Sequence, residues 1–336
     1  MSSLIVHPAA DLPYASFILE GLATLLGPSA ITYSTEGFDR KYRGGRVLAF
    51  YRADDPRARC FVSLHDHSNV NPMGLHWGSV YGMVNVRVED VGREGKVVPI
   101  GPTFGVRLSS RSITARHVLH AARWRGRRGW RATAADGREV AQYLRRRTTI
   151  DRYVPHESDK DYVFYAAWPW VKHPEVNPPR ARFIEACRRA PGLSFEGGFA
   201  PRRRRELPEL IPLSAPRRYA IGEYLDKVGH SAVAFNNPAV HGCQGWKLGE
   251  YLALGKAIIS LPLSLALPAE LEHGVHLHVV DGSPASLDHA LDRLRCDHAY
   301  RARLQVNARQ WYEAHLAPTQ LARRLLSLMD RPSVDV

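Results

Sequence analysis

The chain has 336 residues, of which 45% are apolar and 24% charged, and its formal net charge is +13. This composition is typical of globular proteins and excludes a disordered or collagen-like chain, while the length favours two domains of about 150 residues each. No apolar run reaches the roughly 18 residues that a membrane-spanning helix needs. The first residues lack the basic and long apolar segments of a signal peptide, so we expect a cytoplasmic protein.

The positive charge comes mainly from arginine, which supplies 39 of the 46 basic residues. These residues are spread evenly over both halves, whereas a nucleic-acid-binding arm would be lopsided. We therefore expect no nucleic-acid partner, and favour attraction to anionic membrane surfaces or nucleotide phosphates. The four cysteines are far apart and contain no CxxC pair, which predicts reduced, buried thiols rather than disulfides or a zinc site. They are Cys60, Cys187, Cys243 and Cys296.

Strands and helices alternate along both halves. The first half predicts strands at 4–6, 46–51, 60–64 and 79–86 and a helix at 14–26, followed by a basic stretch at 123–147 and a linker at 151–160. The second half predicts strands at 162–168, 193–196, 231–236, 257–260 and 275–280, with helices at 180–190, 247–254 and onward to 328. Such alternation indicates two α/β domains with largely parallel sheets, spanning residues 1–157 and 158–336.

The most informative segment is the loop and helix that follow the strand at 231–236. Gly242 and Gly245 would let backbone N–H groups approach a ligand, and a helix N-terminus follows them, where an anion is stabilised. Lys247 in the first turn offers a point charge for a phosphate, and Glu250 could accept hydrogen bonds from a ribose diol. This pattern suits a nucleoside diphosphate. The plainer alternative is a solvated Lys–Glu pair on a helix that follows turn glycines.

The string from Lys247 to Ser260, KLGEYLALGKAIIS, resembles the nucleotide-sugar-binding segment of the "group 1" GT-B glycosyltransferases. The resemblance implies two Rossmann-like domains facing a cleft, with the last helix packing back on the N-terminal domain. It implies a metal-independent transferase of hexosyl type that moves a sugar from a UDP- or GDP-linked donor to a hydroxyl of a saccharide or lipid-linked acceptor, as in polysaccharide biosynthesis. No cofactor is implied, and Glu250 matches the residue that contacts the donor's ribose.

One position departs from the pattern of that class. Retaining members carry a second glutamate eight residues before the ribose-binding one, and here that position is Gly242. The sequence therefore leaves the stereochemical outcome of the transfer open.

Further donor-side candidates lie on neighbouring strand ends. Lys172 and Arg180 flank the loop after the strand at 162–168 and could neutralise a diphosphate. Asn237 follows the next long strand, and Trp246 stands beside Lys247. Two more tryptophans, Trp168 and Trp170, could line a sugar or base pocket or could equally belong to the core.

In the first half, the polar strand end from Leu64 to Asn69 offers Asp66 and His67 as candidate bases for an acceptor hydroxyl. The His65-x-His67 spacing also suits a metal, but no third ligand stands nearby, so we expect no metal site. The segment from Arg123 to Arg131, with Trp124 and Trp130, could dock on the inner face of the membrane, or it could be a basic loop whose tryptophans are anchored in the core.

Two rival functions remain open from the sequence. A nucleotide-sugar epimerase would use the same two-domain plan but needs no acceptor. A non-catalytic basic module that binds nucleic acid or membrane would show a steep salt dependence and no nucleotide preference.

Overall fold

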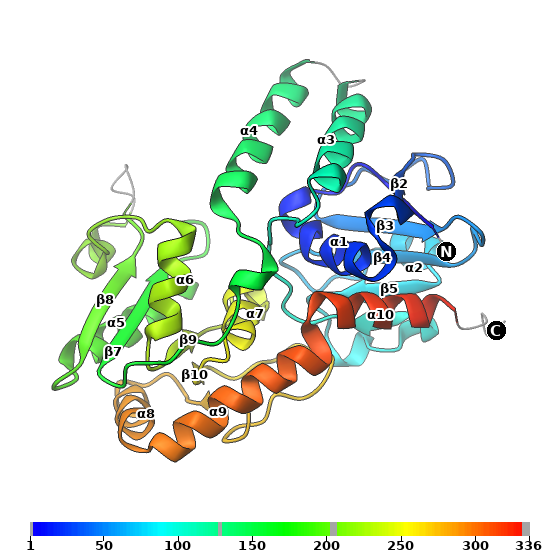
Figure 1. Cartoon of the computed structure of the whole chain (residues 1–336). Helices are drawn as coiled ribbons and strands as arrows, with labels where there is room; N and C mark the ends of the chain where they lie inside the picture. The colour runs from blue at the N-terminus through cyan, green and yellow to red at the C-terminus, as the bar shows by residue number, and fades with distance from the viewer. Residues whose placement is uncertain (1–2, 127–129, 202–206, 331–336) are drawn as a thin grey trace. The chain divides into compact units, whose positions relative to one another are not determined.

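The computed structural model describes residues 3–126, 130–201 and 207–330, without the side chains of 130–137 (Figure 1). The chain forms two compact units. The first comprises Met1–Ile150, Leu265–Pro268 and Ala314–Val336, and the second comprises Asp151–Ser264 and Ala269–Glu313. The first and longest stretch of the first unit ends at Ile150, while the sequence predicts a domain boundary near residue 157. Each unit has an α/β architecture, so the predicted fold class is confirmed.

The first unit is built on one six-stranded sheet in the order β2-β1-β3-β4-β5-β6. Its strands are β1 (Leu4–Val6), β2 (Ile31–Tyr33), β3 (Val47–Arg52), β4 (Arg59–Ser63), β5 (Val80–Met83) and β6 (Val97–Pro99). Its helices are α1 (Leu12–Leu26), α2 (Pro72–Trp77), α3 (Arg111–Gly126), α4 (Trp130–Arg146) and α10 (Pro318–Met329). Only β3 runs antiparallel to its neighbours. The other strands all end at one edge of the sheet, where the segment after β4 carries Asp66 and His67.

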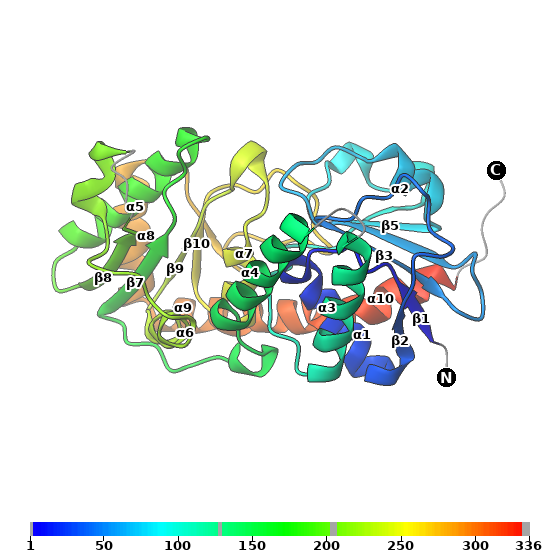
Figure 2. The same cartoon turned by 90° about the horizontal axis from the view of Figure 1, so that it is seen from above.

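The C-terminal helix α10 belongs to the first unit and packs against α1, as Figures 1 and 2 both show. Gly21 makes this close approach possible, because a Cβ placed there would lie 1.9 Å from the backbone oxygen of Pro318. The buried face of α10 presents Leu321, Ala322 and Leu325, at the spacing of an amphipathic helix.

Helices α3 and α4 form a hairpin that carries part of the basic stretch. Residues 127–129 and the side chains of Trp130 and Arg131 lie outside the described part of the chain. In the described part, Trp124 packs edge-on against the ring of His7 at 5.7 Å, and Arg125 pairs with Asp11 at 3.1 Å. Trp124 is therefore anchored in the core of the unit, as the plainer interpretation of this segment expects.

In the described part of the second unit, every paired strand runs parallel to its neighbours. Its strands are β7 (Tyr162–Ala167), β8 (Ser194–Phe199), β9 (Ala234–Asn236), β10 (Ile258–Ser260) and β11 (His278–Val279). Its helices are α5 (Asn177–Arg189), α6 (Ile221–His230), α7 (Trp246–Ala253), α8 (Pro284–Cys296) and α9 (His298–Trp311). The strand expected at 275–280 is thus reduced to two residues. Helix α7 ends as predicted, with Gly255 in the left-handed conformation at φ +58°.

Successive strands of this unit are added on one side of β7 and then on its other side, so the strand order reverses between β7 and β9. Strand β8 pairs with β7 on one side. On the other side the amide of Ala232, just before β9, donates to the carbonyl of Tyr162, and β9 continues through β10 to β11. In open α/β sheets, ligands bind outside the carboxyl ends of the strands at such a reversal. The loops after β7 and β9 are therefore the expected place for a binding site.

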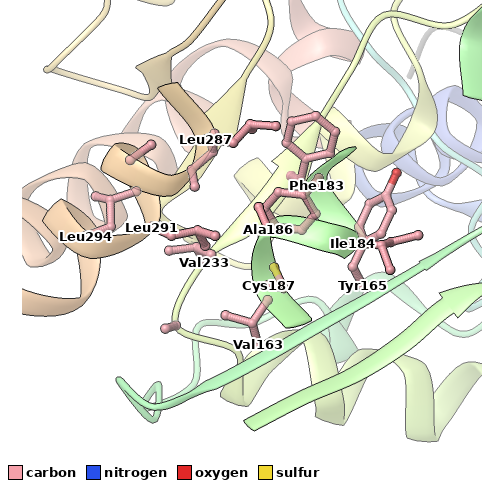
Figure 3. Close-up of a cluster of buried hydrophobic side chains, with 14 of the residues drawn as sticks. Val163, Tyr165, Phe183, Ile184, Ala186, Cys187, Val233, Leu287, Leu291 and Leu294 are labelled. Carbon is pink, nitrogen blue, oxygen red and sulfur yellow. The ribbon is translucent and has the colours of Figure 1, made fainter. Parts of the chain in front are cut away.

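A dense apolar core holds these strands in place (Figure 3). Phe183, Ile184 and Cys187 of α5 meet Leu287 and Leu291 of α8 against the sheet. The ring of Phe183 also stacks on that of Phe235 in β9 at 4.4 Å. This packing positions the start of α5 relative to the end of β9.

The cysteines follow the sequence-based expectation with one exception. Cys60, Cys187 and Cys243 are buried free thiols, but Cys296 is exposed. It occupies the last position of α8, which the buried face of that helix does not include.

We expect Gly21→Ala to lower the free energy of unfolding by about 2 kcal/mol, because the added methyl group forces α1 and α10 apart. Gly222→Ala is the matched control, since a Cβ at this helical glycine meets nothing within 4 Å. The control should keep or slightly raise stability. Urea denaturation followed by fluorescence measures both, and equal stability of the two variants would contradict the close packing.

Candidate functional site

An open pocket of about 520 Å³ lies at the carboxyl ends of β9 and β10 in the second unit. Residues from three consecutive strand-end loops line it, namely Glu175, Val176, Pro179, Asn237, Pro238, Ala239, His241, Gly242, Leu261 and Pro262. The predicted donor-side residues Asn237 and Gly242 are therefore part of one cavity. It lies where the order of the strands makes a ligand site expected.

Arg180, in the first half of α5, connects the two loops of this site. Its side chain is buried, its Nε donates to Oδ1 of Asn237 at 3.0 Å, and its NH1 donates to the carbonyl of Trp168 at 2.9 Å. Among the described residues it has no carboxylate partner. A buried guanidinium that contacts only neutral oxygens keeps a full positive charge at the site, and this favours an anionic ligand.

The loop after β9 turns sharply before α7 begins. His241 and Gly242 both take left-handed backbone conformations, at φ +56° and +72°. A non-glycine residue in this region is strained, and such strain is often found at functional sites. A Cβ at Gly242 would lie only 3.0 Å from Oγ of Ser264, so a larger residue at this position would be strained and crowded.

Helix α7 begins after Gly245, its N-cap, which has no side chain to accept from the first amides. The first turn of the helix contains no acidic residue. The helix dipole places partial positive charge at this end, in the same loop as Gly242. The anion-binding role of this segment stays a prediction, which this helix end favours.

Lys247, in the first turn of α7, has its amine among three tyrosine rings. Its Nζ lies 4.8 Å from the ring centroid of Tyr224 and 5.7 Å from those of Tyr165 and Tyr251. It donates to the hydroxyl of Tyr224 at 2.9 Å. Burial lowers the pKa of Lys247 to about 8, with Glu250 opposing the shift and Arg180 adding to it. The lysine is therefore still mainly charged at neutral pH.

Glu250 is 5% exposed and lies about one turn after Lys247 on α7. Its Oε2 accepts from the hydroxyl of Tyr224 at 3.2 Å, so Tyr224 links the carboxylate to the amine. Burial and the charge of Glu250 raise the pKa of Tyr224, which keeps its hydroxyl neutral. The solvated Lys–Glu pair that the sequence left open is not what the structure shows, because Glu250 is buried and the lysine's amine lies among tyrosines.

Sequence reasoning missed Tyr224 and Asn177. Tyr224 belongs to α6, where it resembles any core aromatic in an amphipathic pattern. Asn177 holds the β7–α5 loop, since its side chain accepts from the amide of Trp170 and donates to the carbonyl of the same residue. An asparagine before two prolines was the available signal, but it is typical of many turns.

The remaining donor-side candidates differ in their surroundings. Lys172 is exposed in the β7–α5 loop, and Trp246 is half-buried at the start of α7. Trp168 is 51% exposed, and the guanidinium of Arg218 lies 4.7 Å from its ring centroid. Trp168 is therefore a surface residue beside the site rather than a core residue.

The predicted acceptor-side residues lie in the first unit. Asp66 forms an ion pair with Arg46, whose guanidinium also lies 4.5 Å from the ring centroid of Tyr14. His67 stacks on His65 at 4.7 Å. Burial, together with His67 and Arg46, lowers the pKa of His65. Asp66 and His67 thus stand together at the strand-end edge of the first sheet.

Within residues 3–126, 130–201 and 207–330, no three His, Cys, Asp or Glu side chains are grouped so that they could hold a metal ion. No helix in the same residues is both long and apolar enough to cross a membrane.

Comparison with known proteins gives matches only among solved structures. No protein-family model and no curated protein matches the chain. A glycosyltransferase from Rickettsia africae ESF-5 is similar at a TM-score of 0.49 and 9% identity, over 93% of this chain and 80% of that one. Alr3699/HepE of Anabaena in complex with UDP is similar at 0.41 and 13%, over 74% and 71%. TarM is similar at 0.39 and 8%, over 52% of this chain, which spans about a third of TarM's length (36%).

We expect the site to bind inorganic diphosphate less well as Lys247 loses its proton. Lys247→Met is the reference, because it keeps the length of the side chain without its charge. The ratio of wild-type to variant affinity should be constant below pH 7 and fall above pH 8, by up to about tenfold per pH unit. Isothermal titration between pH 6.5 and 9.5 measures the ratio. A ratio that does not change with pH would contradict a role of this ammonium group in anion binding.

Proposed function

We propose that the chain is a glycosyltransferase whose second unit binds the diphosphate of a nucleotide sugar. The observation that carries the proposal is the meeting of buried Arg180 and the desolvated amine of half-buried Lys247 with the N-terminus of α7, where the strand order reverses. Two carboxylates lie nearby: the charge of Glu250 opposes the lowering of the Lys247 pKa, and Glu175 lines the pocket and lies 3.3 Å from Nδ1 of His173. The two cations and the helix N-terminus converge on one place, which favours a diphosphate there.

Different residues of the site would bind different parts of the donor. Arg180, Lys247 and the amides near Gly245 would hold the diphosphate, as the two charges and the helix dipole favour. Glu250 would accept from the ribose hydroxyls after exchanging its contact with Tyr224. The 520 Å³ pocket lined by Asn237 and Gly242 would receive the sugar.

The reaction breaks the bond between the anomeric carbon and the diphosphate oxygen and forms one to an acceptor hydroxyl. Negative charge grows on the leaving diphosphate, and Arg180 and Lys247 stabilise it without reorganisation. The acceptor's proton must pass to a base, for which we propose Asp66 or His67. The ion pair with Arg46 occupies the Asp66 carboxylate, so a substrate hydroxyl would share it with that arginine.

Several finer points belong to the same proposal. We propose hexosyl transfer from a UDP- or GDP-linked donor to a saccharide or lipid-linked acceptor, without a metal, because the two side-chain cations supply the charge that a metal would. We place the reaction in polysaccharide biosynthesis, in the cytoplasm. Contact with the inner face of the membrane would involve the basic segment from Arg123 to Arg131.

The rival functions make different predictions in the same experiments. An epimerase would convert the nucleotide sugar with no acceptor present, so product analysis without acceptor distinguishes it from a transferase. A non-catalytic basic module would bind polyanions with a steep salt dependence and no preference among nucleotides. The buried position of Arg180 and Lys247 favours a shaped ligand site over such a module.

We expect one nucleoside diphosphate to stabilise the protein in a thermal-shift screen of UDP, GDP, ADP and TDP. A ligand at 100 times its Kd adds about 2.7 kcal/mol of stability, which raises the melting temperature measurably. The nucleoside monophosphates are the control, because the two cations require a diphosphate. A shift from none of the diphosphates would refute the proposed donor site.

We expect Glu250→Gln to bind that diphosphate at least tenfold more weakly, because an amide is a poorer acceptor for two ribose hydroxyls than a carboxylate. The amide oxygen can still accept from Tyr224, so the fold should be kept. Glu223→Gln is the matched control on neighbouring α6, where the carboxylate pairs with exposed Arg217. Titration calorimetry measures both variants, and an unchanged Kd in folded Glu250→Gln would remove this residue from the site.

A further inference from the structure

A second pocket, of about 470 Å³, lies in the first unit beside α10 and is not part of the proposed donor site. Seven residues line it: Pro268, Ala314, His315, Gln320, Arg323, Arg324 and Ser327. None of these side chains is acidic. The proposed reaction uses none of them, so the pocket needs an explanation of its own.

The polar face of α10 forms one wall of this pocket. Gln320, Arg323, Arg324 and Ser327 follow the spacing i, i+3, i+4 and i+7, which places them on one side of a helix. The opposite side is buried against α1, and Gly21 allows the two helices to touch. The polar face is therefore held in a fixed position rather than on a loose surface segment.

Two arginines supply uncompensated positive charge to the pocket. Arg324 is half-buried, and its NH1 donates to the carbonyl of Pro99 at 3.2 Å. Arg323 donates to Oε1 of Gln320 at 2.5 Å. In the described part of the chain neither guanidinium pairs with a carboxylate. Burial lowers the pKa of Arg324, which shows that its charge is partly removed from water.

We propose that this pocket binds the phosphate group of a small phosphate ester. A guanidinium matches phosphate oxygens with parallel hydrogen bonds, and Ser327 and Gln320 add hydroxyl and amide donors on the same face. The volume lies in the range of small-molecule sites and exceeds what a bare ion would fill, which favours an ester over inorganic phosphate. This inference does not depend on the proposed transferase activity.

The direct test is calorimetric titration of the full chain with glycerol 3-phosphate. We expect saturable binding that weakens at least tenfold in Arg323→Ala, because a charge-assisted hydrogen bond is lost. Ser327→Asp is the second variant. It leaves both arginines in place but adds a carboxylate at an exposed position, so it should compete with the phosphate without unfolding the helix.

Arg57→Ala is the matched control, an exposed arginine of the same unit that is not among the pocket residues. The affinity of the Arg57→Ala variant for glycerol 3-phosphate should stay within twofold of the wild-type value. Equal losses in Arg57→Ala and Arg323→Ala would mean general attraction to a basic protein and would overturn the proposal. Absence of saturable binding in the wild type would overturn it as well. Binding of the nucleoside diphosphate in the second unit should be unchanged in every variant, which separates this site from the donor site.

The same phosphate chemistry occurs in free metabolites and in lipid headgroups. Vesicles of phosphatidylglycerol, compared with vesicles of phosphatidylcholine, distinguish the two sources. Binding to the anionic vesicles that disappears in Ser327→Asp would identify a headgroup. Binding of glycerol 3-phosphate alone, with the same sensitivity, would identify a soluble ester.

Discussion

The candidate site depends on two cations that are largely removed from water, with Glu250 as the buried carboxylate near them. A charge removed from water is costly unless it is paired or hydrogen-bonded, and here Arg180 contacts two neutral oxygens while Lys247 contacts a tyrosine hydroxyl. Desolvation accordingly lowers the pKa of Lys247 to about 8. A bound diphosphate would supply negative charge beside both cations, so the feature that makes their burial costly would favour such a ligand.

The fold holds these groups together through the order of its strands. Because β7 lies beside β9 and not only beside β8, the loops after β7 and β9 meet, and Arg180 can reach both. The stacked rings of Phe183 and Phe235 join α5 to β9 one turn further into the core. This apolar packing thus supports Arg180 and fixes its position relative to the loop after β9.

The two units carry different kinds of polar surface. In the second unit, cations lie at the ends of parallel strands, which is the usual position for a ligand in an α/β sheet. In the first unit, one basic pocket lies on a helix instead, and Asp66 with His67 lies at the strand-end edge. We therefore propose separate places in the chain for a diphosphate, for a second phosphate group and for a base.

Local pattern was enough to predict the α/β class and the helix at α7 with Gly255 after it, while the role of Gly242, Gly245, Lys247 and Glu250 as one functional segment stays a prediction. These features depend on residues within a few turns of one another, where periodicity and glycine placement carry the information. Only the tertiary structure showed that β3 is antiparallel, that Arg180 bonds to Asn237, and that Tyr224 stands between Lys247 and Glu250. Such contacts join residues more than twenty positions apart, so they are set by strand order and side-chain packing, which no local pattern contains.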